Sequence, residues 1–191
     1  MNGKKRIAEQ SRIWLWESFE ELLQKREFSE ITITAIAQNA ELARKTFYNS
    51  FASKEELLNY HLNKILNQYF DELQLIPKNQ RTKQTVLTTF FEFWWKYKDL
   101  LILLKKRNLF QGLINQWLVT AADRYNLFEV SWHINSQHSN AKETRYLMSF
   151  ILGGLSNVLS TWFDNPSPDS PDVMISITKQ IIDYQSALNC E

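Results

Sequence analysis

ITITAIAQNAELARKTFYNSFASKEELL, residues 31–58, is the stretch that decides the fold of this 191-residue chain. Its apolar residues are spaced for two short helices, expected near 33–40 and 43–49, with Leu42 filling the turn between them. Phe47 then points inward from the second helix, which leaves that helix with a polar outward face. Two helices joined by a short turn, the second exposing side chains that can bind bases and phosphates, form a helix-turn-helix.

The outward face of the second helix carries side chains suited to DNA. Arg44 and Lys45 can donate to guanine O6 and N7, and the methyl group of Thr46 can pack on thymine. Tyr48 and Lys54 are placed for phosphate oxygens, and Lys54 also begins the next helix, whose first amides favour anions. The predicted DNA-binding residues are Thr32, Arg44, Lys45, Thr46, Tyr48, Asn49 and Lys54.

Helices are expected nearly throughout the chain, because only 4 Gly and 4 Pro interrupt apolar residues spaced three and four apart. Thr32 is an expected N-cap, and Ser53 with Glu56 forms a capping box. The expected helices cover about 5–25, 33–40, 43–49, 53–76, 82–97, 100–107, 109–125, 143–163 and 172–188. The fold class is therefore all-α, with residues 1–60 as an N-terminal helix-turn-helix DNA-binding domain and 61–191 as a larger C-terminal helical ligand-binding and dimerisation domain.

The composition is that of an ordinary globular protein, 44% hydrophobic and 23% charged with a net charge of +1, which excludes a disordered or collagen-like chain. Residues 1–60 hold nine basic and nine acidic residues, so DNA affinity must come from the placement of charges. A shallow salt dependence of DNA binding is expected.

The single cysteine, Cys190, and the lack of a zinc-type cluster predict no metal or cofactor. No membrane-length apolar run is present, and we expect a cytoplasmic protein.

The aromatic residues, 7 Trp, 7 Tyr and 12 Phe, gather in clusters that can line a pocket for a small hydrophobic or aromatic effector. Core packing is the alternative for each of them. Because Trp94 and Trp95 are adjacent, they cannot both point inward. His133 and His138 flank a polar loop and either bind a ligand or are solvated, whereas His61 is expected to pack where the two domains meet. The predicted ligand-binding residues are Phe90, Trp94, Trp95, Trp117, Tyr125 and Trp132.

The last two expected helices carry narrow apolar stripes that favour a four-helix interface between two copies of the chain. Gly153 and Gly154 would allow close approach of a partner backbone. The alternative is that both stripes face the protein's own core. The predicted interface residues are Leu147, Ile151, Gly154, Leu155, Val158, Trp162, Met174, Ile177, Ile181 and Tyr184.

Residues 5–58 resemble the DNA-binding domain of the TetR family of transcriptional repressors. The resemblance rests on Ile36-Ala37, Tyr48, Phe51, Ser53-Lys54-Glu55 and Leu57-Leu58 at the family's spacing. It implies a homodimer that binds a palindromic operator with one recognition helix per subunit. It also implies that a small molecule bound in the C-terminal half releases the DNA.

Three residues depart from the family pattern. Glu41 replaces the usual turn glycine, at a cost on the order of 1 kcal/mol if the site needs a left-handed backbone. Ala43 replaces an N-cap serine worth about 1 kcal/mol. Glu27 replaces a glycine before the second helix. These changes keep open a helical ligand-binding or interaction protein whose head no longer binds DNA. A small helical enzyme is disfavoured, because no catalytic constellation is recognisable.

Overall fold

The structure, a computed structural model, describes residues 3–124, 141–165 and 167–188. Within these ranges all regular elements are helices, so the expected all-α class is confirmed. Short 3-10 turns at Phe28–Glu30 and Lys78–Gln80 precede α2 and α5. The helices are α1 (Gly3–Lys25), α2 (Ile33–Asn39), α3 (Arg44–Tyr48), α4 (Lys54–Leu75), α5 (Lys83–Lys96), α6 (Lys98–Lys106), α7 (Phe110–Arg124), α8 (Ala141–Trp162) and α9 (Pro171–Leu188).

Side-chain caps start three of these helices where the sequence places a Ser or Thr. Thr32 Oγ1 accepts the Ala35 N–H at 3.1 Å, and Thr82 Oγ1 accepts the Thr85 N–H at 3.1 Å. Ser53 Oγ accepts the Glu56 N–H at 3.2 Å, as the capping box predicts. The Glu56 carboxylate, however, accepts the N–H of Ala52 rather than that of Ser53. The caps satisfy amide groups that have no partner within their own helix.

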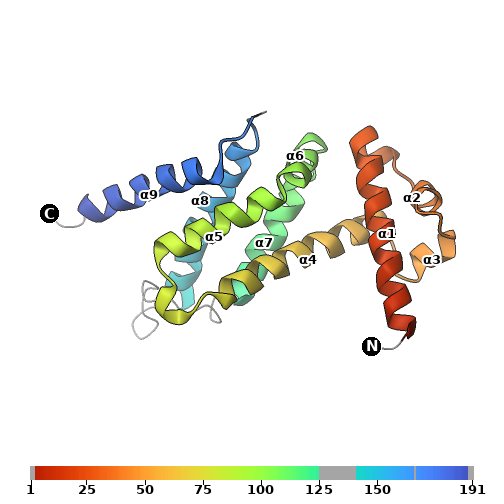
Figure 1. The fold of residues 1–191 in the computed structure, drawn as a ribbon, viewed down its shortest axis with the longest axis horizontal. Helices are drawn as coiled ribbons and strands as arrows, with labels where there is room; N and C mark the ends of the chain where they lie inside the picture. The colour runs from red at the N-terminus through yellow and green to blue at the C-terminus, as the bar shows by residue number, and fades with distance from the viewer. Residues whose placement is uncertain (1–2, 125–140, 166, 189–191) are drawn as a thin grey trace.

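The molecule is elongated, with α1, α2 and α3 at one end, α5, α8 and α9 toward the other, and α6 and α7 between them (Figure 1). We call residues 3–60 the head and the remaining described residues the body. In the head α1 packs on α2 and α2 on α3, while in the body α4 packs on α5 and α7, and α5 packs on α9. The long helix α4 runs from one part into the other, so it crosses the expected domain boundary without a break. Buried apolar side chains form one continuous cluster through both parts.

The turn between α2 and α3 has the left-handed backbone that its sequence position suggested. Glu41 has φ 54°, a region where side chains other than glycine are strained. Leu42 is half-buried against the core, and its N–H donates to Ala37 O at 2.8 Å. Ala43 occupies the N-cap position of α3 and provides no side-chain cap. Glu27, in contrast, has φ −68°, so its backbone has no need of glycine.

Replacing Glu41 with glycine is expected to raise the free energy of unfolding by about 1 kcal/mol, because glycine adopts the left-handed region without a Cβ clash. Urea unfolding followed by circular dichroism measures the change. Asn108 also has a positive φ, 58°, but asparagine tolerates this region, so Asn108→Gly serves as the control with a smaller gain. Equal gains at the two sites would contradict strain at Glu41.

Candidate functional site

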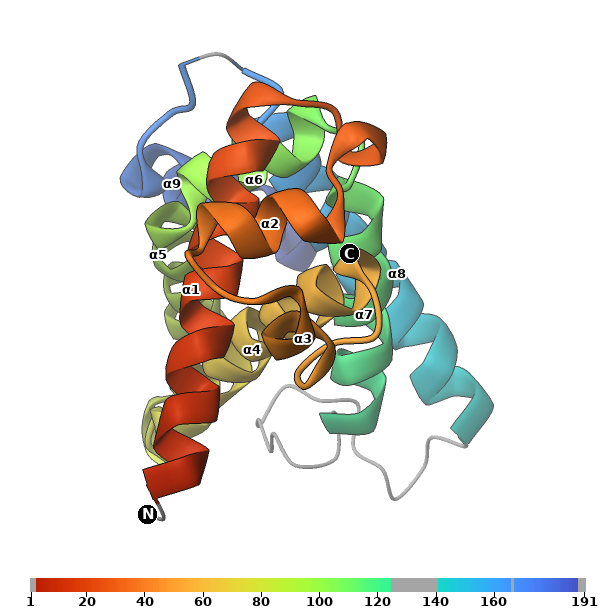
Figure 2. The same ribbon diagram turned by 90° about the vertical axis from the view of Figure 1, so that its right-hand side faces the viewer.

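The third helix is held against the head by two aromatic side chains. Phe47 is fully buried and Phe51 nearly so, and their ring centroids lie 5.9 Å apart. Because α3 has only five residues, this anchor sets the direction of its remaining side chains. In Figure 2, α2 and α3 lie across α1 on the outer side of the head. The inward direction of Phe47 and Phe51 is confirmed.

The exposed face of α3 brings together most of the residues predicted to bind DNA. Arg44 donates from Nη2 to Tyr48 Oη at 3.0 Å, and its guanidinium lies 5.4 Å from the centre of the Tyr48 ring. Tyr48 is 47% exposed. Lys45 and Asn49 are exposed, whereas Thr46 is half-buried. The face therefore presents donors of both the base-reading and the phosphate-binding kind.

Thr32 and Lys54, the other two residues predicted to bind DNA, form hydrogen bonds within the protein. The Thr32 hydroxyl is used as the N-cap of α2 but stays exposed at the start of that helix. Lys54 does not point its ammonium group into solvent. Its Nζ donates to the carbonyl oxygens of Phe28 at 2.6 Å, Ser29 at 3.4 Å and Ile31 at 2.8 Å. An ammonium has three N–H donors, so none is left for a phosphate in this arrangement. In this structure the Lys54 ammonium thus attaches α4 to the segment before α2, and its contact with phosphate stays a prediction.

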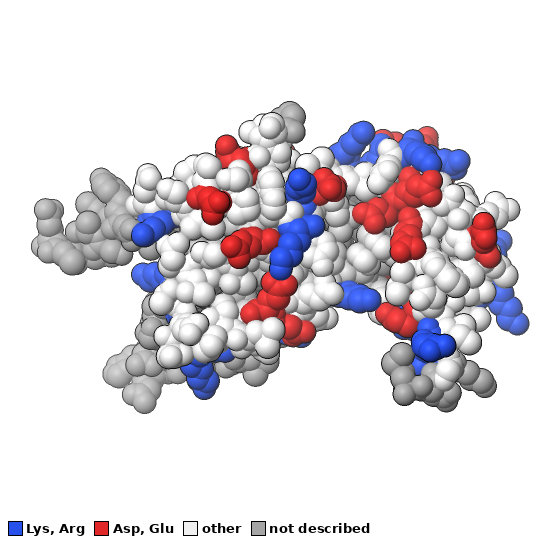
Figure 3. Space-filling view, in the orientation of Figure 1, with Lys and Arg blue, Asp and Glu red and all other residues white. Residues whose placement is uncertain are grey.

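Charges on the head are mixed, as the sequence indicated. Figure 3 shows cationic side chains along the outer edge of the head and acidic ones nearer its middle, with no broad patch of one sign on this face. DNA binding by such a surface would depend on a few well-placed donors and less on net charge.

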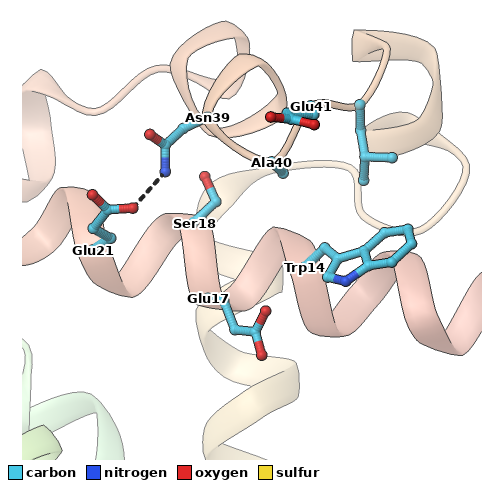
Figure 4. Close-up of a pocket in the computed structure, with 8 residues that line it drawn as sticks. Trp14, Glu17, Ser18, Glu21, Asn39, Ala40 and Glu41 are labelled. Atoms are coloured by element: carbon cyan, nitrogen blue, oxygen red, sulfur yellow. Dashed lines mark hydrogen bonds between the residues drawn. The ribbon is translucent and has the colours of Figure 1, made fainter.

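A groove of about 450 Å³ separates α1 from the α2–α3 turn. Figure 4 shows three carboxylates around it, those of Glu17, Glu21 and Glu41. The Glu21 carboxylate binds Lys25 Nζ at 2.6 Å and accepts from Asn39 Nδ2 at 3.0 Å, and these contacts lower its pKa, the one with Lys25 first. Because carboxylates repel phosphates, this side of the head is unsuited to nucleic acid.

Where the head meets the body, His61 of α4 stacks on Trp16 of α1. The two ring centroids are 3.6 Å apart and the planes are within 3° of parallel. Burial, and to a smaller extent the charge of Lys64, lowers the pKa of His61 to about 4. The histidine is therefore neutral near pH 7, and its expected packing at this junction is confirmed.

The aromatic residues predicted to line a pocket divide between two places. Phe90, Trp94 and Trp117 are all at most 1% exposed and pack around Tyr69. Trp95 is half-buried and stacks instead on Trp162, at 5.5 Å between ring centroids. The adjacent tryptophans thus point to different sides, as their adjacency required. Tyr125 and Trp132, like His133 and His138, lie outside the described residues.

Two buried donors in this ring cluster have no acceptor among the described residues. They are the Nε1 atoms of Trp94 and Trp117, whose ring centroids lie 6.1 Å apart. Tyr69 is also buried there, which raises the pKa of its hydroxyl and keeps it neutral. Unpaired buried N–H groups are uncommon in folded proteins. Across the described residues, no group of three His, Cys, Asp or Glu is arranged to hold a metal ion.

The apolar stripe of α8 mostly faces the protein's own core. Trp162 is only 4% exposed, and its Nε1 donates to Asp169 O at 2.9 Å. The prediction that Trp162 lies at an interface is therefore wrong, because the ring fills the space between Phe91 and Trp95. The half-buried Leu155, Val158 and Met174 also pack on the core.

A different set of apolar side chains is exposed. Phe150 is 74% exposed and Tyr146 65%, one turn apart on α8, while Ile177 and Val173 on α9 are 46% and 43% exposed. Of these only Ile177 was predicted, although the spacing of four residues was visible in both helices. Gly154 is exposed and Ile151 half-buried. The side chains of Leu147, Ile181 and Tyr184 are not among those described.

Comparison with known proteins agrees with the fold and places the head in a family. Residues 19–60 match the family model described as bacterial regulatory proteins, tetR family. Over 60 residues the chain is 38% identical to DhaS of Lactococcus lactis, an HTH-type transcriptional activator of the dhaKLM operon, a match that covers 31% of each chain. Over 85 residues it is 32% identical to the HTH-type transcriptional regulator EthR of Mycobacterium tuberculosis, covering 41% of this chain and 39% of EthR.

The matches to these curated relatives thus span less than two-fifths of their length. Solved structures extend the similarity of fold to the body. Lin0861 of Listeria innocua superposes with a TM-score of 0.66 at 13% identity, covering 97% of this chain and 95% of its own. The structure of the activator DhaS gives 0.60 at 16% identity, covering 92% and 95%. No helix among the described residues is both long and apolar enough to cross a membrane. The head is thus similar in sequence to bacterial regulatory proteins of the tetR family over residues 19–60, and the chain as a whole shares its all-helical fold with the solved structures of Lin0861 and DhaS.

Proposed function

We propose that this protein is a transcriptional regulator that binds a palindromic DNA operator as a homodimer and represses transcription until a small effector releases it. The observation that carries the proposal is the exposed face of α3, where Arg44, Lys45, Tyr48 and Asn49 project from a helix anchored by Phe47. In a two-fold dimer, two such helices would enter successive major grooves about 34–36 Å apart. The similar protein DhaS is named an activator, so the test must distinguish repression from activation.

The first test is selection of duplexes from a random DNA library by the wild-type protein, followed by gel-shift titration at several salt concentrations. A palindromic, salt-sensitive consensus supports the proposal. A head that selects no sequence would instead favour a helical ligand-binding or interaction protein. A reporter gene behind the selected operator then shows whether binding lowers or raises transcription.

Replacing Arg44 with alanine is expected to weaken binding by about 1–3 kcal/mol and to relax the preference at one operator position, because a bidentate contact to guanine is lost. Tyr48→Ala should weaken binding to all sequences about equally. Repeating the selection with each variant measures both effects. An unchanged consensus with Arg44→Ala would show that the reading face of α3 has been assigned wrongly.

The homodimer would form through α8 and α9. Tyr146, Phe150, Val173 and Ile177 supply exposed apolar surface on these helices. A Cβ built on Gly153 or Gly154 meets no atom of the described residues within 4 Å, so a partner helix has room to approach. Leu147, Ile181 and Tyr184 remain proposed members of the same surface. Sedimentation of Phe150→Glu tests the proposal, since a charge at a dimer interface should yield monomers, whereas an unchanged mass would exclude Phe150 from it.

The effector would bind in the body beside the cluster of Phe90, Trp94 and Trp117. Two indole N–H groups without an acceptor cost about 1–3 kcal/mol each, and a ligand oxygen could recover that cost. Among the described residues, Arg81 and Arg107 are charged side chains with little exposure, and both donate to backbone carbonyls outside this cluster. The described residues place no buried counter-ion beside this cluster for a charged ligand, so these observations support a neutral, flat, apolar effector with hydrogen-bond acceptors.

Acetophenone and ethylbenzene are matched probes for this chemistry, because they share size and shape and only the first has a carbonyl acceptor. Acetophenone is expected to bind about fivefold more tightly for each indole hydrogen bond it makes. Tryptophan fluorescence and release of operator DNA provide the readouts. Trp94→Phe and Trp117→Phe should reduce the preference. Equal binding of both probes to the wild-type protein would contradict a role for the indole donors.

A further inference from the structure

Arg107, the residue that follows α6, attaches the body to the C-terminal end of α1. Its Nε donates to Leu23 O at 2.6 Å and its Nη2 to Gln24 O at 3.0 Å, while Nη1 pairs with the Glu27 carboxylate. The Arg107 side chain is only 9% exposed. The last carbonyls of a helix lack partners within that helix and carry its negative partial charge. A residue of the body therefore caps a helix of the head.

Two residues earlier, Lys105 attaches the same end of α6 to α8. Its Nζ donates to Ser160 O at 2.8 Å and to Ser160 Oγ at 2.7 Å, and it lies 2.7 Å from the carboxylate of Asp164. The Lys105 side chain is 16% exposed. The end of α6 thus contacts the end of α1 and the end of α8 at once. Both ribbon views place α6 beside the C-terminal end of α1 (Figures 1 and 2).

These contacts add a second attachment between head and body. The first is α4, which is continuous through both and packs on α1 through Trp16 and His61. If α4 were the only connection, the head could rotate about that helix. The contact of Arg107 with the C-terminal end of α1 prevents this rotation. Among the described residues, Arg107 is the one side chain beyond α4 for which hydrogen bonds to α1 are seen.

We infer that Lys105 and Arg107 fix the separation of the two recognition helices in the dimer, and so determine which half-site spacing the protein accepts in an operator. The inference rests on the proposed function, because α8 carries the proposed dimer surface at Tyr146 and Phe150. Lys105 thus links α8, with its proposed dimer surface, to α6, and Arg107 links α6 to α1 in the head. One base pair of added spacing moves a half-site by about 3.4 Å and rotates it by roughly 34°, which a rigidly attached head cannot follow.

The test uses the full-length protein and the operator selected by the wild type, with spacers lengthened and shortened by one and two base pairs. Wild type, Arg107→Met and Lys105→Met are titrated against every spacer and against an isolated half-site. Lys106→Met is the matched control, because Lys106 is exposed on the same turn. Thermal unfolding by circular dichroism establishes that each variant is folded, and Arg107→Lys replaces Arg107→Met if the latter is not.

Wild type and Lys106→Met are expected to lose at least about tenfold in affinity for each base pair of altered spacing. Arg107→Met and Lys105→Met should lose less than about threefold, with half-site affinity unchanged. Two results would overturn the inference while leaving the proposed function intact: the same spacing preference in all four proteins, or a parallel loss of half-site binding in the two variants. A wild type that binds no operator overturns both.

Discussion

Replacing Lys54 with methionine is expected to lower the free energy of unfolding by about 2–4 kcal/mol, which is large for one residue on a half-exposed helix start. The ammonium group donates to three carbonyl oxygens in residues 28–31, and it lies 4.4 Å from the centre of the Phe28 ring. Methionine keeps the apolar stem of the side chain but removes all three donors. The segment that leads into α2 would then lose its attachment to α4.

Lys45→Met is the matched control for this prediction. Lys45 is exposed on α3, and no hydrogen bond to another described residue is seen for it. Its loss should leave stability nearly unchanged and should alter the preferred DNA sequence, because Lys45 is predicted to donate to guanine. Urea unfolding and gel shifts at several salt concentrations separate the two roles. If Lys54→Met kept normal stability but showed a reduced salt dependence of DNA binding, the result would support the phosphate contact expected from the sequence.

Lowering the pH from 7 to 5 is expected to reduce the free energy of unfolding by about 2 kcal/mol through His61 alone. The pKa of this histidine is about 4 in the folded protein, against 6.5 in the unfolded chain. Between those values the unfolded chain binds the extra proton, so stability is complete above about pH 6.5 and is lost as the pH falls toward 4. The physical cause is the cost of charging an imidazole that is buried against Trp16.

His61→Phe isolates this contribution, because phenylalanine keeps an aromatic ring against Trp16 and does not titrate. Other groups change with pH as well: burial raises the pKa of Glu20, while contacts with Lys64 and Arg12 lower that of Glu9. Their effects are common to wild type and variant and cancel in the difference between the two curves. Urea unfolding at pH 5, 6 and 7 gives that difference. A constant difference across the range would show that His61 keeps an ordinary pKa.

The helices and the local geometry of the head were predictable because they depend on neighbouring residues. The three- and four-residue spacing of apolar side chains located each helix, and Thr32 and Ser53 marked two of the starts. Glu41 lies where the TetR-family pattern has a glycine, and its φ of 54° shows that the site does need a left-handed backbone. The inward direction of Phe47 followed from the same periodicity. Each of these features arises within one or two turns of helix, where the sequence contains all the interacting groups.

The destinations of long or large side chains were not predictable in this way. Lys54 was assigned to phosphate, but its partners lie 23 to 26 residues earlier in the chain. Trp162 belongs to an apolar stripe that matches an interface equally well, and only the positions of Phe91 and Trp95 make it a core residue. An amphipathic helix shows that one face is apolar without showing what covers that face.

By itself, the sequence determined an all-helical chain with a helix-turn-helix near its start and a face of Arg44, Lys45, Tyr48 and Asn49 on the second helix. Only the tertiary structure decided that Lys54 donates hydrogen bonds to the carbonyls of residues 28–31. It also decided that Tyr146 and Phe150 are exposed rings of α8, and that Arg107 joins the body to α1. The physical reason is the separation in sequence between the groups that interact. Helix periodicity and capping are local. A charged side chain instead binds the carbonyls or carboxylates that packing brings near it, and for Arg107 these lie 80 to 84 residues away in sequence.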